Sequence, residues 1–308
     1  MKVIKWILSI ILLSYLVARG TVLFSEDRPS KTSEFLQLED ASVHIFCKGE
    51  KTAKPTVVFE TGFGADSNYS WGNIQDSLAS DTYSCWYDRL GYGNSSALPI
   101  DTSTKDQAAI LSSVIEKVAG EYPVVLVAHS YGGVIARRAI QLHKLDVSAL
   151  ILLDSAHENQ HEILGENFAP IANSVVYATY ADMILGYNRI KNLLVPSDSS
   201  IPEYLSNYYS SLRYAQVLSA YKYRVGFYTP LSELNYNFED VPVYVLSHDD
   251  TAYPDTPRWQ SLHGPWSSLQ DELLSISNIA ERQIVPNASH NIPNDAPDYV
   301  VNLIRKIL

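Results

Sequence analysis

The residues best able to do chemistry lie near the middle of the chain, where Ser130 follows an apolar run at residues 124–128. A helix-like stretch begins a few residues after the serine. Ala128 and Gly132 lie two positions on either side of it, and both are small. A sharp strand-to-helix turn that strains its central residue requires small neighbours there. The pattern is Gly-x-Ser-x-Gly with Ala in the first Gly position, and it predicts that Ser130 is an exposed nucleophile.

A serine hydroxyl is a poor nucleophile at neutral pH, so Ser130 needs a base within hydrogen-bond reach. His290 fits best, because it lies in a predicted loop between the last strand and the last helix. His129 adjoins the serine, but neighbouring side chains point away from each other. His44 and His143 lie outside the loops at the carboxyl ends of the strands. His290 is therefore the candidate general base.

Strand-like and helix-like segments alternate along much of the chain. This alternation predicts an α/β fold with a mostly parallel sheet that is covered by helices on both faces. The predicted strands lie at 36–38, 43–47, 55–60, 83–87, 124–128, 149–153, 241–246 and 282–285, and the predicted helices at 71–79, 104–118, 134–142, 267–276 and 297–307.

The alternation stops at residues 155–240, a helix-like segment that is rich in tyrosine. An insertion at the carboxyl end of a strand lies over the sheet edge where ligands bind, so this segment is predicted to be a helical cap. The predicted core comprises residues 21–154 and 241–308, and residues 1–20 form a separate targeting segment.

Composition limits the class of protein. The chain has 308 residues, 46% of them hydrophobic, which is enough for one large domain with an insertion. Its net charge of -11 argues against binding to nucleic acid, because phosphate backbones need clustered Lys and Arg. We therefore expect a small-molecule substrate.

The amino terminus has the pattern of a signal peptide. Lys2 and Lys5 accompany an apolar stretch at residues 6–18, which is shorter than the roughly 18 or more residues of a comfortable membrane span. Residues 18–20 offer a weak cleavage site. Without cleavage the segment is a short anchor that associates with a membrane. In either case we expect the chain after about Thr21 to be extracytoplasmic: secreted, periplasmic or anchored. A buried first helix of a cytoplasmic protein is the alternative.

Four segments together resemble the α/β-hydrolase superfamily over nearly the whole chain after residue 20. They lie at residues 60–64, 87–93, 128–133 and 289–290. The resemblance implies an α/β-hydrolase fold in which the serine, an acid and the histidine occur in that chain order. It also implies an oxyanion hole made by the backbone N–H groups of Phe63 and Tyr131.

The resemblance leaves two places for the acid and pairs the two cysteines. Asp154 ends the strand after the serine's strand, and its turn resembles the acid-bearing turn of some lipases; Asp249 or Asp250, after the next strand, is the alternative. Asp154 could instead only cap a helix. Cys47 and Cys85 would fall on the second and fourth strands, which are neighbours in this fold, so we expect them to form a disulfide.

A rival motif lies at residues 157–161. His157, Glu158 and His161 match His-Glu-x-x-His, which on a helix can bind zinc with the Glu as base. No third ligand lies at a familiar spacing. A zinc peptidase therefore remains an alternative, as does a binding module without catalytic activity, although such a module would usually have lost the serine or the histidine. We predict no metal ligands and no cofactor.

These patterns together predict a serine hydrolase that forms an acyl-enzyme through Ser130. A serine nucleophile favours esters, thioesters or amides over epoxides and haloalkanes, whose relatives in this fold use Asp. A carboxylesterase or small lipase is the expected activity, followed by an aminopeptidase. The tyrosine-rich cap suggests an acyl pocket with aromatic walls.

Overall fold

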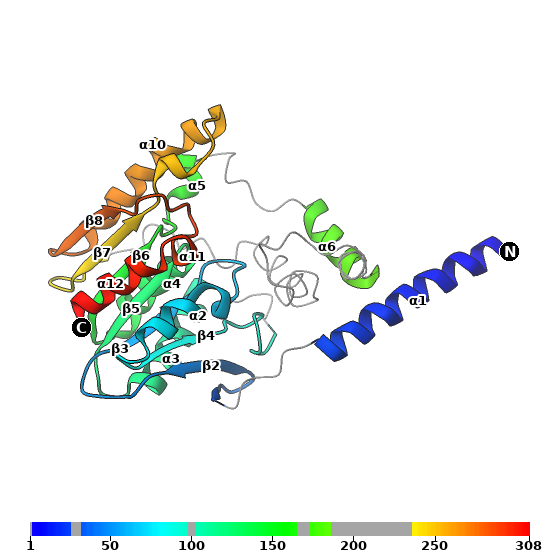
Figure 1. Cartoon of the computed structure of the whole chain (residues 1–308), viewed down its shortest axis with the longest axis horizontal. Coiled ribbons are helices and arrows are strands. Elements are labelled where there is room, and N and C mark those ends of the chain that lie inside the picture. Colours follow the sequence, from blue (N-terminus) through cyan, green and yellow to red (C-terminus); the bar gives the residue numbers. More distant parts are fainter. Residues whose placement is uncertain (1, 26–31, 98–102, 165–172, 186–235) are drawn as a thin grey trace.

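The computed structural model describes residues 2–25, 32–97, 103–164, 173–185 and 236–308. An eight-stranded sheet crosses it in the order β1-β2-β4-β3-β5-β6-β7-β8 (Figure 1). The pairs β1/β2 and β2/β4 are antiparallel, and all the other pairs are parallel. The strands are β1 (Ser33–Gln37), β2 (Ser42–Lys48), β3 (Thr56–Glu60), β4 (Ser84–Tyr87), β5 (Val124–His129), β6 (Val147–Leu153), β7 (Val243–Ser247) and β8 (Ala280–Ile284).

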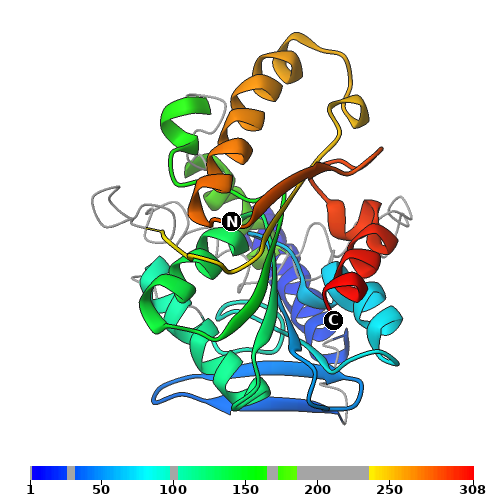
Figure 2. The same ribbon diagram turned by 90° about the vertical axis from the view of Figure 1, so that its left-hand side faces the viewer.

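Helices cover both faces of the sheet, as the alternation predicted. Viewed along the sheet edge, α3 and α4 lie on one face, whereas α2 and α12 lie on the other (Figure 2). The helices are α1 (Lys2–Ser25), α2 (Ser67–Leu78), α3 (Thr104–Ala119), α4 (Tyr131–His143), α5 (Gln160–Leu164), α6 (Asn173–Leu185), α10 (Pro257–Glu272), α11 (Ile292–Asp295) and α12 (Pro297–Ile307), with 3₁₀ turns η3 (Asp250–Ala252) and η4 (Leu273–Ile276). The α/β-hydrolase fold class is therefore confirmed.

The middle strands are apolar at every position because both of their faces are buried. Successive side chains of a strand point to opposite faces. Leu126 packs in the cluster that contains Leu111 of α3, whereas Val127 packs in the cluster that contains Trp71 of α2 and Ile304 of α12. The strand that leads to Ser130 is thus fixed from both sides.

Two helices begin earlier than the apolar spacing predicted. The side chain of Asp66 accepts a hydrogen bond from Tyr69 N (2.8 Å), so α2 begins at Ser67 with a polar first turn. Helix α10 begins at Pro257, capped by Thr256, and continues through Pro265. Proline interrupts helical hydrogen bonding, which is why the sequence indicated a helix only beyond this residue.

Helix α1 covers the predicted targeting segment and continues to Ser25. None of the helices that the structure describes is both long and apolar enough to cross a membrane.

Of the predicted cap, residues 165–172 and 186–235 lie outside the described residues, and with them most of its tyrosines. The cap therefore stays a prediction.

A disulfide ties β2 to β4. Cys47 and Cys85 face each other in the antiparallel register of these strands and are bonded. The pairing that the resemblance implied is therefore present. The bond closes a loop over a sequence separation of 38 residues at one side of the sheet.

Replacing both cysteines by serine is expected to lower the free energy of unfolding by about 4 kcal/mol, because the unfolded chain regains the entropy that the closed loop removed. Urea denaturation of the C47S/C85S variant beside the wild type measures the difference. Intact mass before and after reduction provides the control. Two free thiols in the native, unreduced protein would contradict the assignment.

Candidate active site

Ser130 lies in the turn between β5 and α4 with φ 51° and ψ -124°. A positive φ is unfavourable for a residue other than glycine, so neighbouring structure must hold it. Ser130 N donates to the Leu153 carbonyl (3.0 Å), and Ala156 N donates to the Ser130 carbonyl (2.9 Å). These bonds join the turn to the end of β6. The side chain of Ser130 is half-buried at the end of a fully buried strand.

The two glycines after Tyr131 are required by close packing. A Cβ atom on Gly132 would lie 2.7 Å from the carbonyl oxygens of Glu60 and Thr61. A Cβ atom on Gly133 would lie 2.0 Å from Ser155 Oγ. No real side chain tolerates such contacts, so the small residues of the motif let α4 begin directly against the end of β3.

The structure brings Ser130, His290 and Asp154 into one hydrogen-bonded chain, the Ser-His-Asp chain. His290 Nε2 lies 2.9 Å from Ser130 Oγ, and His290 Nδ1 lies 2.6 Å from Asp154 Oδ2. The three residues follow β5, β8 and β6, whose carboxyl ends meet at one edge of the sheet. The His290 side chain is partly exposed.

The alternative acids make other contacts. Asp249 Oδ1 accepts from Thr251 N (2.9 Å) and Asp249 Oδ2 accepts from Asn287 N (3.0 Å), so this carboxylate caps η3 and holds the loop after β8. Asp250 Oδ1 contacts His248 and His263 instead. Within the described ranges, Asp154 is the carboxylate that contacts the His290 side chain.

Asp154 is fully buried and accepts hydrogen bonds from several donors. Besides His290, its oxygens lie 2.9 and 3.0 Å from His248 Nδ1, 3.3 Å from His248 N and 2.9 Å from Trp266 Nε1. Burial alone would raise the pKa of Asp154, but the hydrogen bonds from His248 and His290 outweigh it and hold the pKa below its usual value. The carboxylate is therefore ionised at neutral pH.

Two further side chains fix the backbone of His290. His129 Nε2 donates to the His290 carbonyl (2.7 Å), and His290 N donates to Tyr253 Oη (2.7 Å). Burial, helped by the neighbouring His290, lowers the pKa of His129 to about 3, so this ring stays neutral. Burial, with the charge of Asp154, raises the pKa of Tyr253 to about 12. Neither group competes with His290 as a base near neutral pH.

A buried arginine positions the predicted oxyanion loop. Arg89 pairs with Glu60 (2.5 Å), donates to the Gly62 carbonyl (2.7 Å) and donates to the Thr61 carbonyl. A Cβ atom on Gly62 would lie 3.2 Å from Ser130 Cβ, so the loop passes close to the serine. Phe63, the next residue, therefore lies beside the turn.

The rings of Phe63 and Tyr131 lie near each other, with centroids 6.5 Å apart. Tyr131 is buried, and its hydroxyl lies 3.4 Å from Thr104 Oγ1 and 3.3 Å from Gln107 Nε2. The two residues predicted to supply the oxyanion donors are thus brought together next to Ser130. Their role in catalysis stays a prediction.

Replacing Arg89 by Met is expected to destabilise the protein by about 3 to 5 kcal/mol, because the buried Glu60 carboxylate loses its ion partner. It should also lower kcat by about 10²- to 10³-fold, because a released loop no longer presents the Phe63 donor. Urea denaturation and steady-state kinetics measure the two effects.

A double variant separates these effects. Adding Glu60→Gln to Arg89→Met removes the unpaired charge, so stability should return in part while kcat stays low. If Arg89→Met alone keeps the wild-type kcat, Arg89 does not position the loop.

The His-Glu-x-x-His motif does not lie on one helix, because His157 precedes α5. Arg137 donates to both oxygens of Glu158 (2.9 Å each), and Tyr236 Oη donates to the same carboxylate (2.9 Å). Glu158 is thus held in a buried ion pair rather than beside a metal site. The side chain of His161 lies outside the described residues.

The sequence did not predict the contacts of four residues around the Ser-His-Asp chain: His248, Trp266, Tyr253 and His129. The first three come from the loop after β7 and from α10, far in sequence from Asp154. His248 carried a usable signal, since it immediately follows a strand that ends at the same sheet edge. Trp266 carried none, because nothing in the local sequence shows that its indole reaches a carboxylate 112 positions away.

Comparison with known proteins gives related sequences and folds. The Bacillus subtilis protein YqjL is 25% identical over 250 residues, 80% of each chain, and an AB hydrolase superfamily protein of Gibberella zeae is 28% identical over 115 residues, 36% of this chain and 35% of that protein. The Cif epoxide hydrolase of Acinetobacter nosocomialis has a similar structure, with a TM-score of 0.69 and 16% identity over 97% of this chain and 96% of that chain.

The structure of Est816, described as an N-acyl homoserine lactone degrading enzyme, is also similar, with a TM-score of 0.61 and 17% identity over 89% of this chain and 100% of that chain. At these identities the structural likeness shows the fold alone. A profile of the family described as "Alpha/beta hydrolase family" matches residues 57–303, which include every residue of the Ser-His-Asp chain. The protein is therefore a hydrolase that belongs to the alpha/beta hydrolase family.

Proposed function

We propose that the protein is a serine hydrolase that cleaves carboxylic esters through an acyl-enzyme on Ser130. The observation that carries the proposal is the contact between Ser130 Oγ and His290 Nε2 (2.9 Å), together with the contact of His290 Nδ1 with the buried Asp154 (2.6 Å). A nucleophile, a base and a group that orients the base are the parts that nucleophilic acyl transfer requires.

In the first half-reaction, Ser130 Oγ attacks the ester carbonyl carbon while His290 Nε2 takes the hydroxyl proton. The carbonyl oxygen becomes an oxyanion, which the backbone N–H groups of Phe63 and Tyr131 would stabilise. Asp154 accepts the Nδ1–H bond and balances the charge of the imidazolium. When the intermediate collapses, the C–O bond to the alcohol breaks, and His290 returns the proton to the leaving oxygen.

In the second half-reaction, His290 takes a proton from water, and the resulting hydroxide attacks the acyl carbon. The bond between the acyl carbon and Ser130 Oγ then breaks, and the protonated His290 returns the proton to the serine. The products are the carboxylic acid, which releases its proton to the solvent, and the free serine. Water must therefore reach Nε2, which the partial exposure of the ring permits.

The residue at position 130 supports esters over epoxides. An aspartate nucleophile opens an epoxide to an ester that water can hydrolyse, whereas a serine would form an ether that the same site could not cleave. A lactone is a cyclic ester, so it falls within the proposed chemistry. Amides and thioesters use the same intermediate and form the alternative substrate classes.

Labelling with a fluorophosphonate probe tests the proposal directly, because the probe phosphonylates an activated serine. Wild-type protein should be labelled, and Ser130→Ala should not. Ser113→Ala is the matched control, since the Ser113 hydroxyl donates to the Ala109 carbonyl on α3, away from the site. Equal labelling of wild type and Ser130→Ala would refute the assignment of the nucleophile.

A substrate panel then separates the classes. We expect short-chain aryl esters and lactones to be hydrolysed by the wild type, while a terminal epoxide of the same size is not. Faster cleavage of an amino-acid anilide than of any ester would favour the aminopeptidase alternative.

We further propose that the protein works outside the cytoplasm. The Cys47–Cys85 disulfide supports this, because such bonds persist in oxidising compartments. The apolar segment at residues 6–18 after two lysines supports export as well. Fractionation of producing cells, with amino-terminal sequencing of the recovered protein, tests both the location and the fate of the segment.

A further inference from the structure

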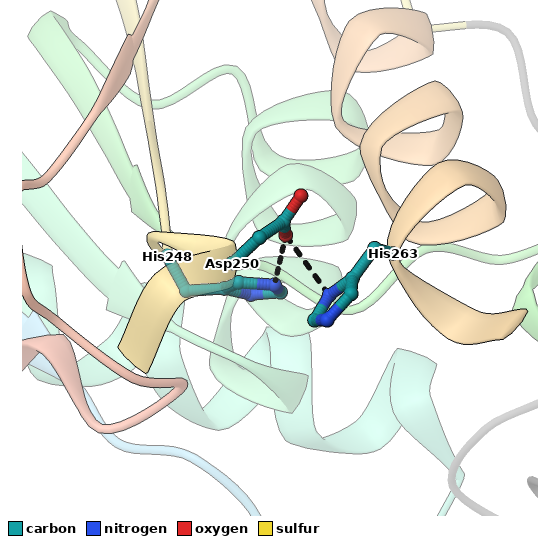
Figure 3. A group of neighbouring side chains, drawn as sticks. All are labelled: His248, Asp250 and His263. Carbon is teal, nitrogen blue, oxygen red and sulfur yellow. Dashed lines mark ion pairs between the residues drawn. The ribbon is translucent and has the colours of Figure 1, made fainter. Parts of the chain in front are cut away.

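A second cluster of polar side chains lies next to Asp154, which one of its members, His248, contacts. His248 follows β7, Asp250 begins η3 and His263 lies on α10. Figure 3 shows the imidazole rings of His248 and His263 converging on the Asp250 carboxylate, one from the loop after β7 and the other from α10. Asp250 Oδ1 lies 3.3 Å from His248 Nε2 and 2.9 Å from His263 Nδ1.

The spacing of these atoms suits a transition-metal ion. One donor atom from each of the three residues lies within 4.8 Å of the other two. Around a tetrahedral zinc ion, with bonds of about 2.0 to 2.2 Å, the ligand atoms are roughly 3.3 to 3.5 Å apart. An ion at the centre of the cluster therefore needs only small rotations of the side chains.

One contact of His248 matches a contact that metal-binding histidines usually make. Its Nδ1 lies 2.9 and 3.0 Å from the oxygens of Asp154, so Nδ1–H donates to that carboxylate. This leaves Nε2 pointing at Asp250. Histidines that bind metals almost always donate their other ring nitrogen to a carboxylate or carbonyl in this way, which fixes the ring and strengthens the ligand. Asp154 thus supports the cluster independently of the three ligand atoms.

The cluster is reachable, and its charge favours a cation. A pocket of about 120 Å³ is lined by all three residues together with Trp266 and Arg282. Arg282 is the basic side chain in this lining, and its charge is paired with Asp271 (2.7 Å). Two imidazoles and one carboxylate leave coordination positions for water on the pocket side.

We propose that His248 Nε2, Asp250 Oδ1 and His263 Nδ1 bind a divalent transition-metal ion of the zinc class. Two imidazole ligands favour Zn²⁺ and its neighbours over Mg²⁺ and Ca²⁺, which prefer oxygen ligands. The ion joins the loop after β7 to α10. It also fixes His248 against Asp154. Only the effect of this contact on catalysis rests on the proposed function.

Metal titration of the whole chain tests the site without any substrate. Protein stripped with a chelator and dialysed should bind one equivalent of Zn²⁺ by calorimetry. Co²⁺ should give the visible spectrum of a low-coordinate site with nitrogen ligands. His263→Gln and Asp250→Asn should each weaken Zn²⁺ binding by at least about 100-fold, since even a lost outer-shell partner can cost that much.

Matched variants make the result specific. His143→Gln removes an exposed histidine at the end of α4 and should bind as the wild type does. His157→Gln tests the His-Glu-x-x-His motif in the same way. Without metal, His263→Gln should melt at the wild-type temperature, and only the wild type should gain thermal stability from Zn²⁺.

The proposal is wrong if the wild type binds no equivalent of Zn²⁺, or if His263→Gln and Asp250→Asn bind it as tightly as His143→Gln. Loss of binding in His157→Gln alone would move the ion to the other motif and also overturn the proposal. Ser130→Ala should bind Zn²⁺ normally, so failure of the proposed esterase function would leave this outcome unchanged.

Discussion

Ser130→Ala is expected to lower kcat on a short-chain ester by about 10⁶-fold, the loss found when a serine hydrolase loses its nucleophile. Ser130 Oγ is the hydroxyl that contacts His290 Nε2, and the turn that presents it is held by backbone bonds to Leu153 and Ala156. Alanine accepts the same backbone with no new contact. The fold should therefore persist while the chemical step is lost.

Steady-state kinetics on purified protein measure this effect, with Ser113→Ala as the variant that should stay fully active. His290→Ala should cost a similar factor, and the double variant with Ser130→Ala should lose no more than either single one, because the two residues act as a unit. Independent, multiplying losses would show that the two side chains do not share one step.

Asp154→Asn is expected to lower kcat by about 10⁴-fold through the tautomer of His290. Trp266 Nε1 and His248 N can only donate, and both lie against Asp154 Oδ1. An asparagine must therefore keep its oxygen there and turn its NH₂ group toward His290 Nδ1. An amide donor at Nδ1 moves the ring proton to Nε2, which then cannot accept the proton of the serine.

Asp249→Asn is the matched control, and it should change kcat by less than about 10-fold, since its carboxylate bonds backbone N–H groups and does not touch His290. Both variants should unfold cooperatively in urea. The pH profile gives a second readout, because Asp154→Asn should regain activity at alkaline pH, where hydroxide replaces the lost base. A larger loss in Asp249→Asn than in Asp154→Asn would reverse the assignment of the acid.

Local pattern was enough to predict much of this fold. Helix α12 has the predicted bounds, because Pro297 begins it and its buried face repeats with helical spacing. The turn at Ser130 could be predicted because its demands fall on adjacent residues. The part of helix α10 before Pro265 could not, since a proline inside a helix is tolerated only when tertiary packing compensates.

The surroundings of Asp154 show what local pattern leaves out. Asp154 and Asp249 both follow parallel strands, so the spacing does not distinguish them as the acid. The choice depends on which carboxylate turns toward the loop that carries His290, which is 136 positions from Asp154. His248 and Trp266 reach Asp154 only because β6, β7 and α10 pack together. Such contacts between distant segments have no signature in the spacing of either segment.

Backbone hydrogen bonds join Ser130 to the end of β6, so the serine and the acid form one part of the site and His290 forms another. The two parts differ in local stability. The serine and Asp154 directly follow the interior strands β5 and β6, whereas His290 follows β8, which lies at an edge of the sheet. Edge elements open locally at a lower free-energy cost than buried ones. Heat or denaturant should therefore remove the base before the sheet unfolds, so the temperature limit of activity is set by the stability of this edge and not by that of the whole protein.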